Sequence, residues 1–229
     1  APWVTWPDFA LHVLPDNVPL EAAVLMEPTA GSVHCLYERL QVRAGESVAI
    51  LGPGARGQIL LQLALAAGAR PTLVSGIRRD ARVRLPMAKT LGADRVVNVD
   101  EEDLIAAARE LTCGQGFDVV VENAGVASAV EQAIEIARPG GRVMISGGGI
   151  RGGVTIPLHT WPVIVKELTL YGEISHNWSS WHTAVEMAGR GQVRLEPLLT
   201  RVYPLSAWEQ GFQDAATGDD VMRVALRPD

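Results

Sequence analysis

The sequence predicts an α/β fold built on a doubly wound, parallel sheet of six strands. Six short apolar runs recur along the chain, and segments with helical spacing lie between them. The runs are apolar on both faces, which is typical of parallel strands that helices cover on each side. A glycine-rich hexapeptide directly follows the first run, where the ligand crevice of a doubly wound sheet is found.

The chain before the sheet is predicted to be extended at first and then helical. Prolines punctuate residues 1–18, and helical spacing begins at residues 19–26. We expect Pro28 to interrupt this helix because proline lacks an amide N–H, and we expect helical spacing to resume over residues 29–40. A turn at residues 43–45 then leads into the first strand.

Strands and helices alternate through the middle of the chain. The predicted strands are residues 48–51, 72–75, 95–97, 119–121, 143–146 and 168–171. The predicted helices between them are residues 58–67, 79–91, 103–111, 127–137 and 162–166. The tail is surplus to this sheet, and we expect helices at 181–189 and 206–216 and a closing strand at 222–226.

The hexapeptide spells G-x-G-x-x-G at residues 52–57, between a predicted strand and a predicted helix. Gly52 permits a tight turn, Gly54 lets the backbone approach a pyrophosphate, and Gly57 lets helix and strand pack closely. Free N–H groups and the dipole at the helix start attract phosphates. The alternative is a glycine turn in another α/β sheet, since the chain has 23 glycines, but the placement favours a dinucleotide site in a Rossmann fold.

Candidate cofactor-binding residues follow four of the predicted strands, because carboxyl ends of parallel strands meet at one edge of the sheet. Glycine is dense at three of these ends, which suits close approach of a ligand, although ordinary turns also use glycine. The candidates are Gly52, Gly54, Ala55, Arg56, Gly57, Ser75, Gly76, Arg78, Arg79, Asn123, Ala124, Gly125, Ser146, Gly147 and Gly148.

Composition argues against several functional classes. The 229 residues are 48% hydrophobic, enough for a substantial core, and the net charge of −6 argues against a general nucleic-acid binder. No apolar run reaches the roughly 18 residues of a membrane span. Cys35 and Cys113 are too few for a disulfide framework, so we expect a cytoplasmic protein. The chain opens on Ala1 and a strand-like segment, from which we expect a fragment or a processed chain.

Further motifs extend along essentially the whole chain. They are Glu27-Pro28, V-R-A-G-E-S-V at 42–48, A-K-T-L-G-A-D at 88–94, G-F-D-V-V-V-E at 116–122, R-P-G-G-R-V at 138–143, K-E-L-T-L-Y-G at 166–172, P-L-L-T at 197–200 and Y-P-L at 203–205. In this combination the chain resembles the medium-chain, zinc-type alcohol dehydrogenases, in the branch with sorbitol and threonine dehydrogenases.

The resemblance implies an NAD(P)-linked oxidation of a secondary alcohol or polyol to a ketone, with zinc polarising the alcohol oxygen. It implies a small-molecule alcohol or ketone as substrate and a homo-oligomeric assembly. It also divides the chain into an extended segment from the catalytic domain (1–18), the dinucleotide-binding Rossmann domain (19–191) and a segment that returns to the catalytic domain (192–229). The sequence is compatible with a polyol, an amino alcohol or a simple secondary alcohol.

The zinc ligands of the family, a Cys and a His-Glu pair, belong to an N-terminal domain that this sequence does not contain. None of its five histidines stands in a Gly-His-Glu setting. Glu27 alone matches a family position near the metal, and catalytic zinc normally needs three protein ligands. We therefore expect zinc in the parent enzyme and not on this chain alone. Glu27 is either a residual metal-site residue or a helix-terminal carboxylate, and the sequence assigns no catalytic residue.

The end of the second strand favours NADP over NAD. NAD-specific relatives carry an acidic residue about 20 positions beyond the glycine loop, and Gly76 fills that position here. Arg78 and Arg79 follow within reach of a 2′-phosphate. Asp80 caps the next helix or reaches a ribose, which keeps NAD open. Arg56 departs from the small or apolar residue of relatives, and either assists the pyrophosphate or obstructs the ligand.

Two other functions fit the glycine loop. One is a non-catalytic module that binds or senses NADPH without turnover. The other is a methyltransferase that binds S-adenosylmethionine, which would make the downstream motifs a coincidence. A short-chain dehydrogenase is excluded because no tyrosine stands in Tyr-x-x-x-Lys, and a serine hydrolase lacks its Gly-x-Ser-x-Gly elbow.

Overall fold

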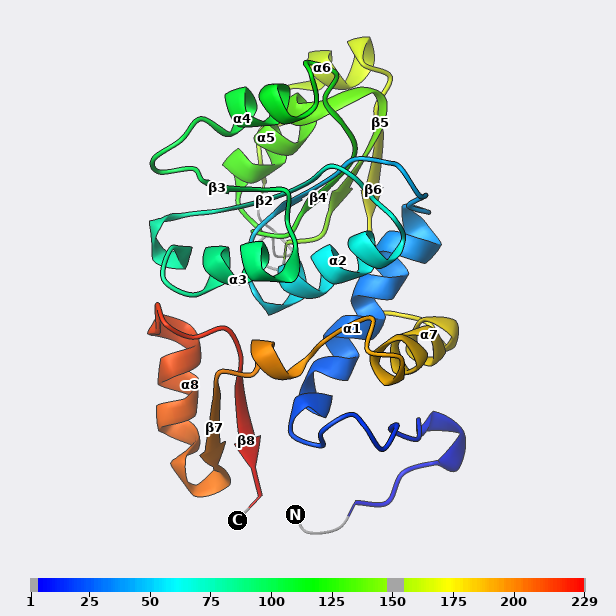
Figure 1. Ribbon diagram of the computed structural model, residues 1–229, viewed down its shortest axis with the longest axis vertical. Helices are drawn as coiled ribbons and strands as arrows, with labels where there is room; N and C mark the ends of the chain where they lie inside the picture. Colours follow the sequence, from blue (N-terminus) through cyan, green and yellow to red (C-terminus); the bar gives the residue numbers. More distant parts are fainter. Residues whose placement is uncertain (1–3, 148–154, 229) are drawn as a thin grey trace.

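The computed structural model describes residues 4–147 and 155–228, and a parallel sheet forms its centre (Figure 1). Within these residues the sheet has six strands in the order β3-β2-β1-β4-β5-β6, and each neighbouring pair is parallel. The strands are β1 (Val48–Leu51), β2 (Thr72–Gly76), β3 (Arg95–Asn98), β4 (Phe117–Glu122), β5 (Ala137–Ile145) and β6 (Thr169–Gly172). The predicted doubly wound sheet is confirmed.

Helices cover both faces of the sheet, because successive residues of each central strand point to opposite sides. Val48 and Ile50 pack with the core that contains α2 (Ala55–Ala66) and α3 (Arg84–Leu91). Ala49 and Leu51 pack with the core that contains α4 (Leu104–Leu111) and α5 (Ala127–Ile136). Figure 1 shows these two layers below and above the sheet, and α6 (Thr160–Val165) comes just before β6.

A helical column precedes the sheet and runs past Pro28 without a break. It begins as a 3-10 turn (Ala22–Leu25), continues as α1 (Met26–Val33) and ends as a π-helical segment (His34–Arg39). The expected interruption at Pro28 is wrong, because Pro28 lies in the first turn of α1, where an amide N–H has no intrahelical acceptor to lose. The column packs against α2 and against α7 (Trp178–Gly189).

Several boundaries differ from the predicted ones for local reasons. A 3-10 turn (Arg78–Asp80) precedes α3, because the Asp80 carboxylate accepts the Ile77 N–H and holds the chain in a tight turn. As a result α3 begins at Arg84 instead of residue 79. The strand β5 begins at Ala137, directly after α5, and is longer than the predicted run 143–146.

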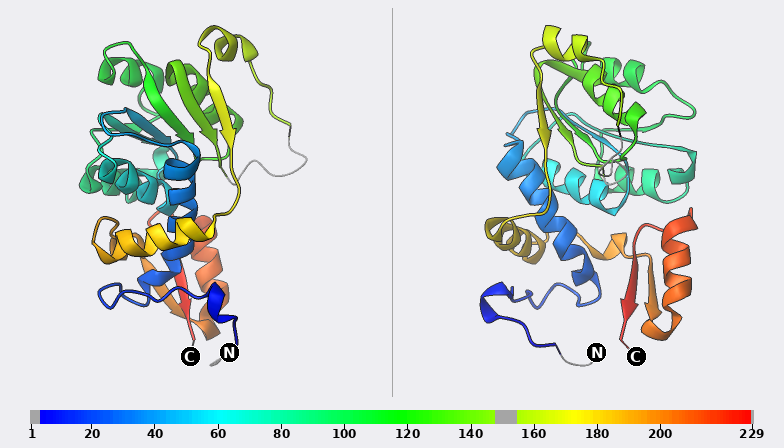
Figure 2. Two further views of the ribbon diagram at one scale, coloured as in Figure 1. Left: turned by 90° about the vertical axis from the view of Figure 1, so that its right-hand side faces the viewer. Right: turned by 180° about the vertical axis from the view of Figure 1, so that it is seen from behind.

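The last part of the chain forms a small separate layer. Strands β7 (Arg201–Pro204) and β8 (Val224–Arg227) pair in parallel, and α8 (Trp208–Thr217) packs against them. Figure 2 shows this layer at the end of the structure remote from α4 and α6. The helix and the closing strand were predicted, whereas β7 was not, because four residues that end in a proline give little strand signal. Among the described residues, no helix is long and apolar enough to cross a bilayer.

Candidate functional site

A cavity of about 370 Å³ opens at the carboxyl ends of β1, β2 and β4. The glycine loop forms one wall, and the residues that follow β2 and β4 form the others. The predicted site residues that line it are Gly52, Gly54, Ser75, Gly76, Arg79, Asn123 and Ala124. Segments far apart in the sequence therefore converge here, as expected at the point where the strand order reverses between β1 and β4.

The three glycines of the loop have different surroundings. A Cβ at Gly57 would lie 2.1 Å from the Gly52 carbonyl oxygen, so the start of α2 touches the loop backbone. Gly52 has φ +115°, and a Cβ there would lie 2.9 Å from the Ala124 nitrogen. A Cβ at Gly54 would meet no atom within 4 Å among the described residues. Gly52 and Gly57 thus serve the packing of the loop, whereas Gly54 leaves its surface open.

Helix α2 begins beside this open surface. Gly54 is its N-cap residue, and among the described residues no side chain caps the first turn. The first turn contains no acidic residue that would neutralise the helix dipole. Backbone N–H groups at Ala55, Arg56 and Gly57 are therefore available to an anion, which is the arrangement that binds phosphates at helix N-termini.

The end of β2 has no room for a side chain at Gly76. A Cβ there would lie 2.6 Å from Pro53 Cγ and 2.8 Å from Asp80 Oδ2. Asp80 is buried, and its carboxylate binds the Ile77 N–H at 3.0 Å and Arg84 Nη1 at 2.9 Å. The carboxylate of Asp80 therefore occupies the space next to Gly76 that a longer side chain would need.

The two arginines predicted to meet a 2′-phosphate have different partners. Arg79 Nη2 donates to the carbonyl oxygens of Ala216 at 2.9 Å and Gly218 at 3.2 Å. Arg78 is largely exposed, and its nearest ion pair is a long one of 4.0 Å to Glu101 Oε1. Arg79 thus holds the C-terminal segment at the edge of the cavity, while the guanidinium of Arg78 is accessible.

Arg56 does not line the cavity, and its side chain reaches across the ends of β4 and β5 to the chain that follows β6. Its Nη1 donates to Asn123 Oδ1 at 3.0 Å and to Ser146 Oγ at 2.8 Å. Its Nη2 forms an ion pair with Glu173, whose side chain is 4% exposed. Sequence reasoning singled out Arg56 but missed Glu173, although a carboxylate directly after an apolar strand was a signal that a partner was needed.

A second buried carboxylate, Glu122 at the end of β4, was also missed as a site residue. Its Oε1 accepts the Gly125 N–H at 2.5 Å and its Oε2 accepts the Gly147 N–H at 3.1 Å. Glu122 therefore joins the turns that follow β4 and β5, and brings Gly125 and Gly147 together. The predicted site residue Gly148 lies outside the described residues.

Cys35 lies behind this group of polar residues, in the π-helical segment, and is fully buried. Burial raises the pKa of its thiol far above the ordinary value, and the Glu173 carboxylate raises it further. The thiol is therefore protonated at neutral pH. A buried thiol with a raised pKa packs as a small apolar side chain and is a poor metal ligand.

The described residues do not form a zinc site. They contain no group of three or more His, Cys, Asp or Glu side chains that could hold a metal ion. Glu27 is exposed in the first turn of α1, where a carboxylate suits the helix dipole. The residues present therefore do not fit a catalytic zinc ion by themselves.

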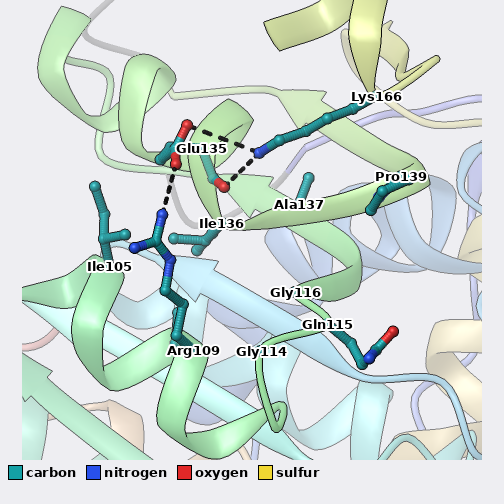
Figure 3. A pocket seen from close by; sticks show the side chains of 11 residues that line it. Ile105, Arg109, Gly114, Gln115, Gly116, Glu135, Ile136, Ala137, Pro139 and Lys166 are labelled. Atoms are coloured by element: carbon teal, nitrogen blue, oxygen red, sulfur yellow. Dashed lines mark hydrogen bonds and ion pairs between the residues drawn. The ribbon is translucent and has the colours of Figure 1, made fainter.

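A further hollow of about 180 Å³ lies at the opposite edge of the sheet, at the amino ends of the strands (Figure 3). Arg109 pairs with Glu135 at 3.2 Å, and Lys166 Nζ donates to the Glu135 carbonyl oxygen at 2.6 Å. The charged side chains that line this hollow are thus engaged with one another, as the dashed lines in Figure 3 show. The glycine loop, the helix terminus and the converging strand ends all lie at the other edge.

Comparisons with known proteins agree with this geometry. The family described as zinc-binding dehydrogenase matches residues 56–190. D-arabitol-phosphate dehydrogenase of Enterococcus avium is 32% identical over 212 residues, which are 93% of this chain and 59% of that protein. L-threonine 3-dehydrogenase of Pyrococcus furiosus is 34% identical over 201 residues, which are 87% of this chain and 56% of that protein.

A solved structure gives the same result at the level of the fold. A protein of Sinorhizobium meliloti 1021, solved bound to NADP, superposes with a TM-score of 0.82 at 26% identity, over 93% of this chain and 61% of that one. The chain thus spans about 60% of the length of these relatives. Since the family match covers more than half of the chain and the doubly wound sheet agrees with it, the chain belongs to the zinc-binding dehydrogenase family.

Proposed function

We propose that this chain is the nicotinamide-dinucleotide-binding part of an alcohol or polyol dehydrogenase. The observation that carries the proposal is the cavity beside Gly54, next to the uncapped N-terminus of α2. The pyrophosphate would bind the N–H groups at residues 55–57, and the adenosine would enter the cavity between the ends of β1 and β2. The bound cofactor would supply the hydride acceptor or donor, and these residues would hold and orient it.

The parent reaction, in this proposal, moves hydride between a secondary alcohol and nicotinamide in the cytoplasm. The zinc would be held by residues of the parent enzyme outside this chain, with Glu27 as the one residue here that lies near it. The relatives named for D-arabitol phosphate and L-threonine support a small hydroxylated substrate. The segments 1–18 and 192–229 would then pack against the domain that carries the zinc, and residues 19–191 would form the cofactor domain.

We also propose that NADP is the preferred cofactor. No carboxylate projects from position 76, where Pro53 and Asp80 exclude any side chain, and the accessible guanidinium of Arg78 lies just beyond. Arg78 would bind the 2′-phosphate, with Arg79 at the cavity edge as a second cation. The negative charge of Asp80 would repel a 2′-phosphate, but the ion pair with Arg84 neutralises this carboxylate.

Calorimetric titration with NADPH, NADH and S-adenosylmethionine tests the proposal. We expect NADPH to bind more tightly than NADH, and Arg78→Ala to weaken NADPH by about tenfold, the usual loss for one charge-assisted contact, while leaving NADH unchanged. Arg82→Ala is the matched control, because Arg82 is equally exposed and pairs with Asp219. Preference for NADH would contradict the NADP assignment, and binding of S-adenosylmethionine alone would contradict the function.

The surface beside the outer strand β6 supports a homo-oligomer. Strand β6 is one of the two outer strands, and Trp161, Ile164 and Val165 of the adjacent α6 are 63%, 62% and 53% exposed. An unpaired strand beside exposed apolar side chains is a typical contact between copies of a chain. Sedimentation velocity should therefore show a dimer or a larger assembly, and a monomer at micromolar concentration would contradict this.

A further inference from the structure

The cavity occupies one half of the crevice, and Arg56 occupies the other. The strand order reverses between β1 and β4, so a dinucleotide that crosses this point places one nucleotide over β1 and β2 and the other over β4 and β5. The cavity lies over the ends of β1 and β2, and the turn that follows β4 forms its far wall. On the second side the Arg56 guanidinium reaches across the strand ends to Asn123, Ser146 and Glu173.

These contacts anchor Arg56 firmly. Each acceptor comes from a different strand end: Asn123 follows β4, Ser146 follows β5 and Glu173 follows β6. The Arg56 side chain is 24% exposed and that of Glu173 is 4% exposed, so the pair is shielded from water. Breaking a shielded ion pair leaves a buried charge without compensation, which makes displacement of Arg56 by a ligand costly.

The Glu173 carboxylate depends mainly on Arg56 for charge compensation. Its Oε2 is buried and has no nitrogen or oxygen hydrogen-bond partner among the described residues, and the weak donor near this carboxylate is the Cys35 thiol. A buried carboxylate with few other donors depends on its ion pair with Arg56, which stabilises the closed arrangement.

We propose that the Arg56–Glu173 ion pair closes the nicotinamide half of the crevice, so that an adenine nucleotide binds without rearrangement while a dinucleotide must first displace Arg56. This inference rests on the proposed function and adds to it a residue that discriminates between mononucleotide and dinucleotide. Gly54 and the start of α2 stay open in both states, because Arg56 points away from them toward the strand ends. The adenine half therefore binds independently of the ion pair.

Two pairs of ligands distinguish binding in one half of the crevice from binding in the other, whichever dinucleotide the protein prefers. NADP⁺ contains 2′,5′-ADP, and NAD⁺ contains 5′-ADP, so each dinucleotide has a matched adenine nucleotide that lacks the nicotinamide ribose. Calorimetric titration of the full chain with all four compounds measures the contribution of the second half. We expect the preferred dinucleotide to bind no more tightly than its matched adenine nucleotide.

Two variants remove the obstruction in different ways. Glu173→Gln keeps the shape and removes the negative charge that holds the guanidinium, whereas the double variant Arg56→Val with Glu173→Leu removes both charges and leaves no buried charge unpaired. We expect each to tighten the preferred dinucleotide by about tenfold while the matched adenine nucleotide changes by less than about twofold. The double variant Arg109→Val with Glu135→Leu is the control, because this pair lies at the opposite edge of the sheet (Figure 3).

The outcomes distinguish the two proposals. The inference is overturned if the wild-type chain binds a dinucleotide about tenfold more tightly than its adenine nucleotide, or if both variants, shown to be folded by thermal unfolding, leave dinucleotide affinity unchanged. In either case adenine-nucleotide binding would still support the proposed function. Binding of none of the four compounds by the wild type or the variants would overturn the proposed function together with this inference.

Discussion

The two halves of the crevice are built from different kinds of groups. The half over β1 and β2 is shaped by backbone, with Gly54 facing open space and Gly57 in contact with the Gly52 carbonyl. The half over β4, β5 and β6 is filled by side chains, with Arg56 bound to three acceptors. A backbone cradle stays open without a ligand, whereas charged side chains satisfy one another and close the space. Under the proposed function, the binding site for the adenine nucleotide is therefore preformed, whereas binding of the nicotinamide nucleotide depends on a rearrangement of Arg56.

The largest effect that tests this comparison is expected at Gly57. In Gly57→Val the new Cβ would lie 2.1 Å from a backbone oxygen, and backbone cannot move aside as a flexible side chain can. We expect the free energy of unfolding to fall by about 3 kcal/mol, as for strongly overpacked sites, measured by urea denaturation.

Gly54→Ala is the matched control in the same loop. Its φ of −64° suits any residue, and its Cβ would meet no described atom within 4 Å. We expect stability to change by less than about 0.5 kcal/mol, while the affinity for adenine nucleotides falls because the methyl group enters the phosphate position. Equal destabilisation by both variants would show that the open half is not preformed as the structure indicates.

The glycine loop and the sheet were predictable from sequence because their signals are local. Apolar runs and glycine spacing depend on contacts between close neighbours in the chain. The positive φ of Gly52 and the close packing at Gly57 agree with the turn and the packing predicted for them, whereas the approach of a pyrophosphate to Gly54 stays a prediction. The closed half was not predictable in the same way. Arg56 and Glu173 are 117 residues apart in the chain, and only the order of the strands brings them together.

The arginines after β2 show a second limit of sequence reasoning. Spacing placed Arg79 near a 2′-phosphate, and it does line the cavity. Its guanidinium, however, also binds carbonyl oxygens near the end of α8, far along the chain. A sequence pattern identifies a cation but not the groups that compete for it, and this competition depends on how the C-terminal layer packs.

A smaller effect is expected behind the closed half, where the His34–Arg39 segment places Cys35 near Glu173. Glu38 in this segment accepts hydrogen bonds from His34, Ser179 and Ser180. Partial burial raises the pKa of Glu38, but these hydrogen bonds and one from Asn177 outweigh it and lower the pKa to about 2. The ionised carboxylate therefore ties this segment to α7.

The sign of the pH dependence follows from the lowered pKa. The stabilisation is fully present above the ordinary carboxyl pKa of 4.5 and is lost as the pH falls toward the folded-state value of about 2. We expect Glu38→Gln to lower the free energy of unfolding at pH 7 by about 1 kcal/mol, a value reduced by solvent screening, and the difference from wild type to vanish between pH 4.5 and 2. Denaturation of both proteins across this range measures the difference directly. A gain of dinucleotide affinity in Glu38→Gln at pH 7, with adenine-nucleotide affinity unchanged, would show in addition that the closed half depends on this anchor as well as on Arg56.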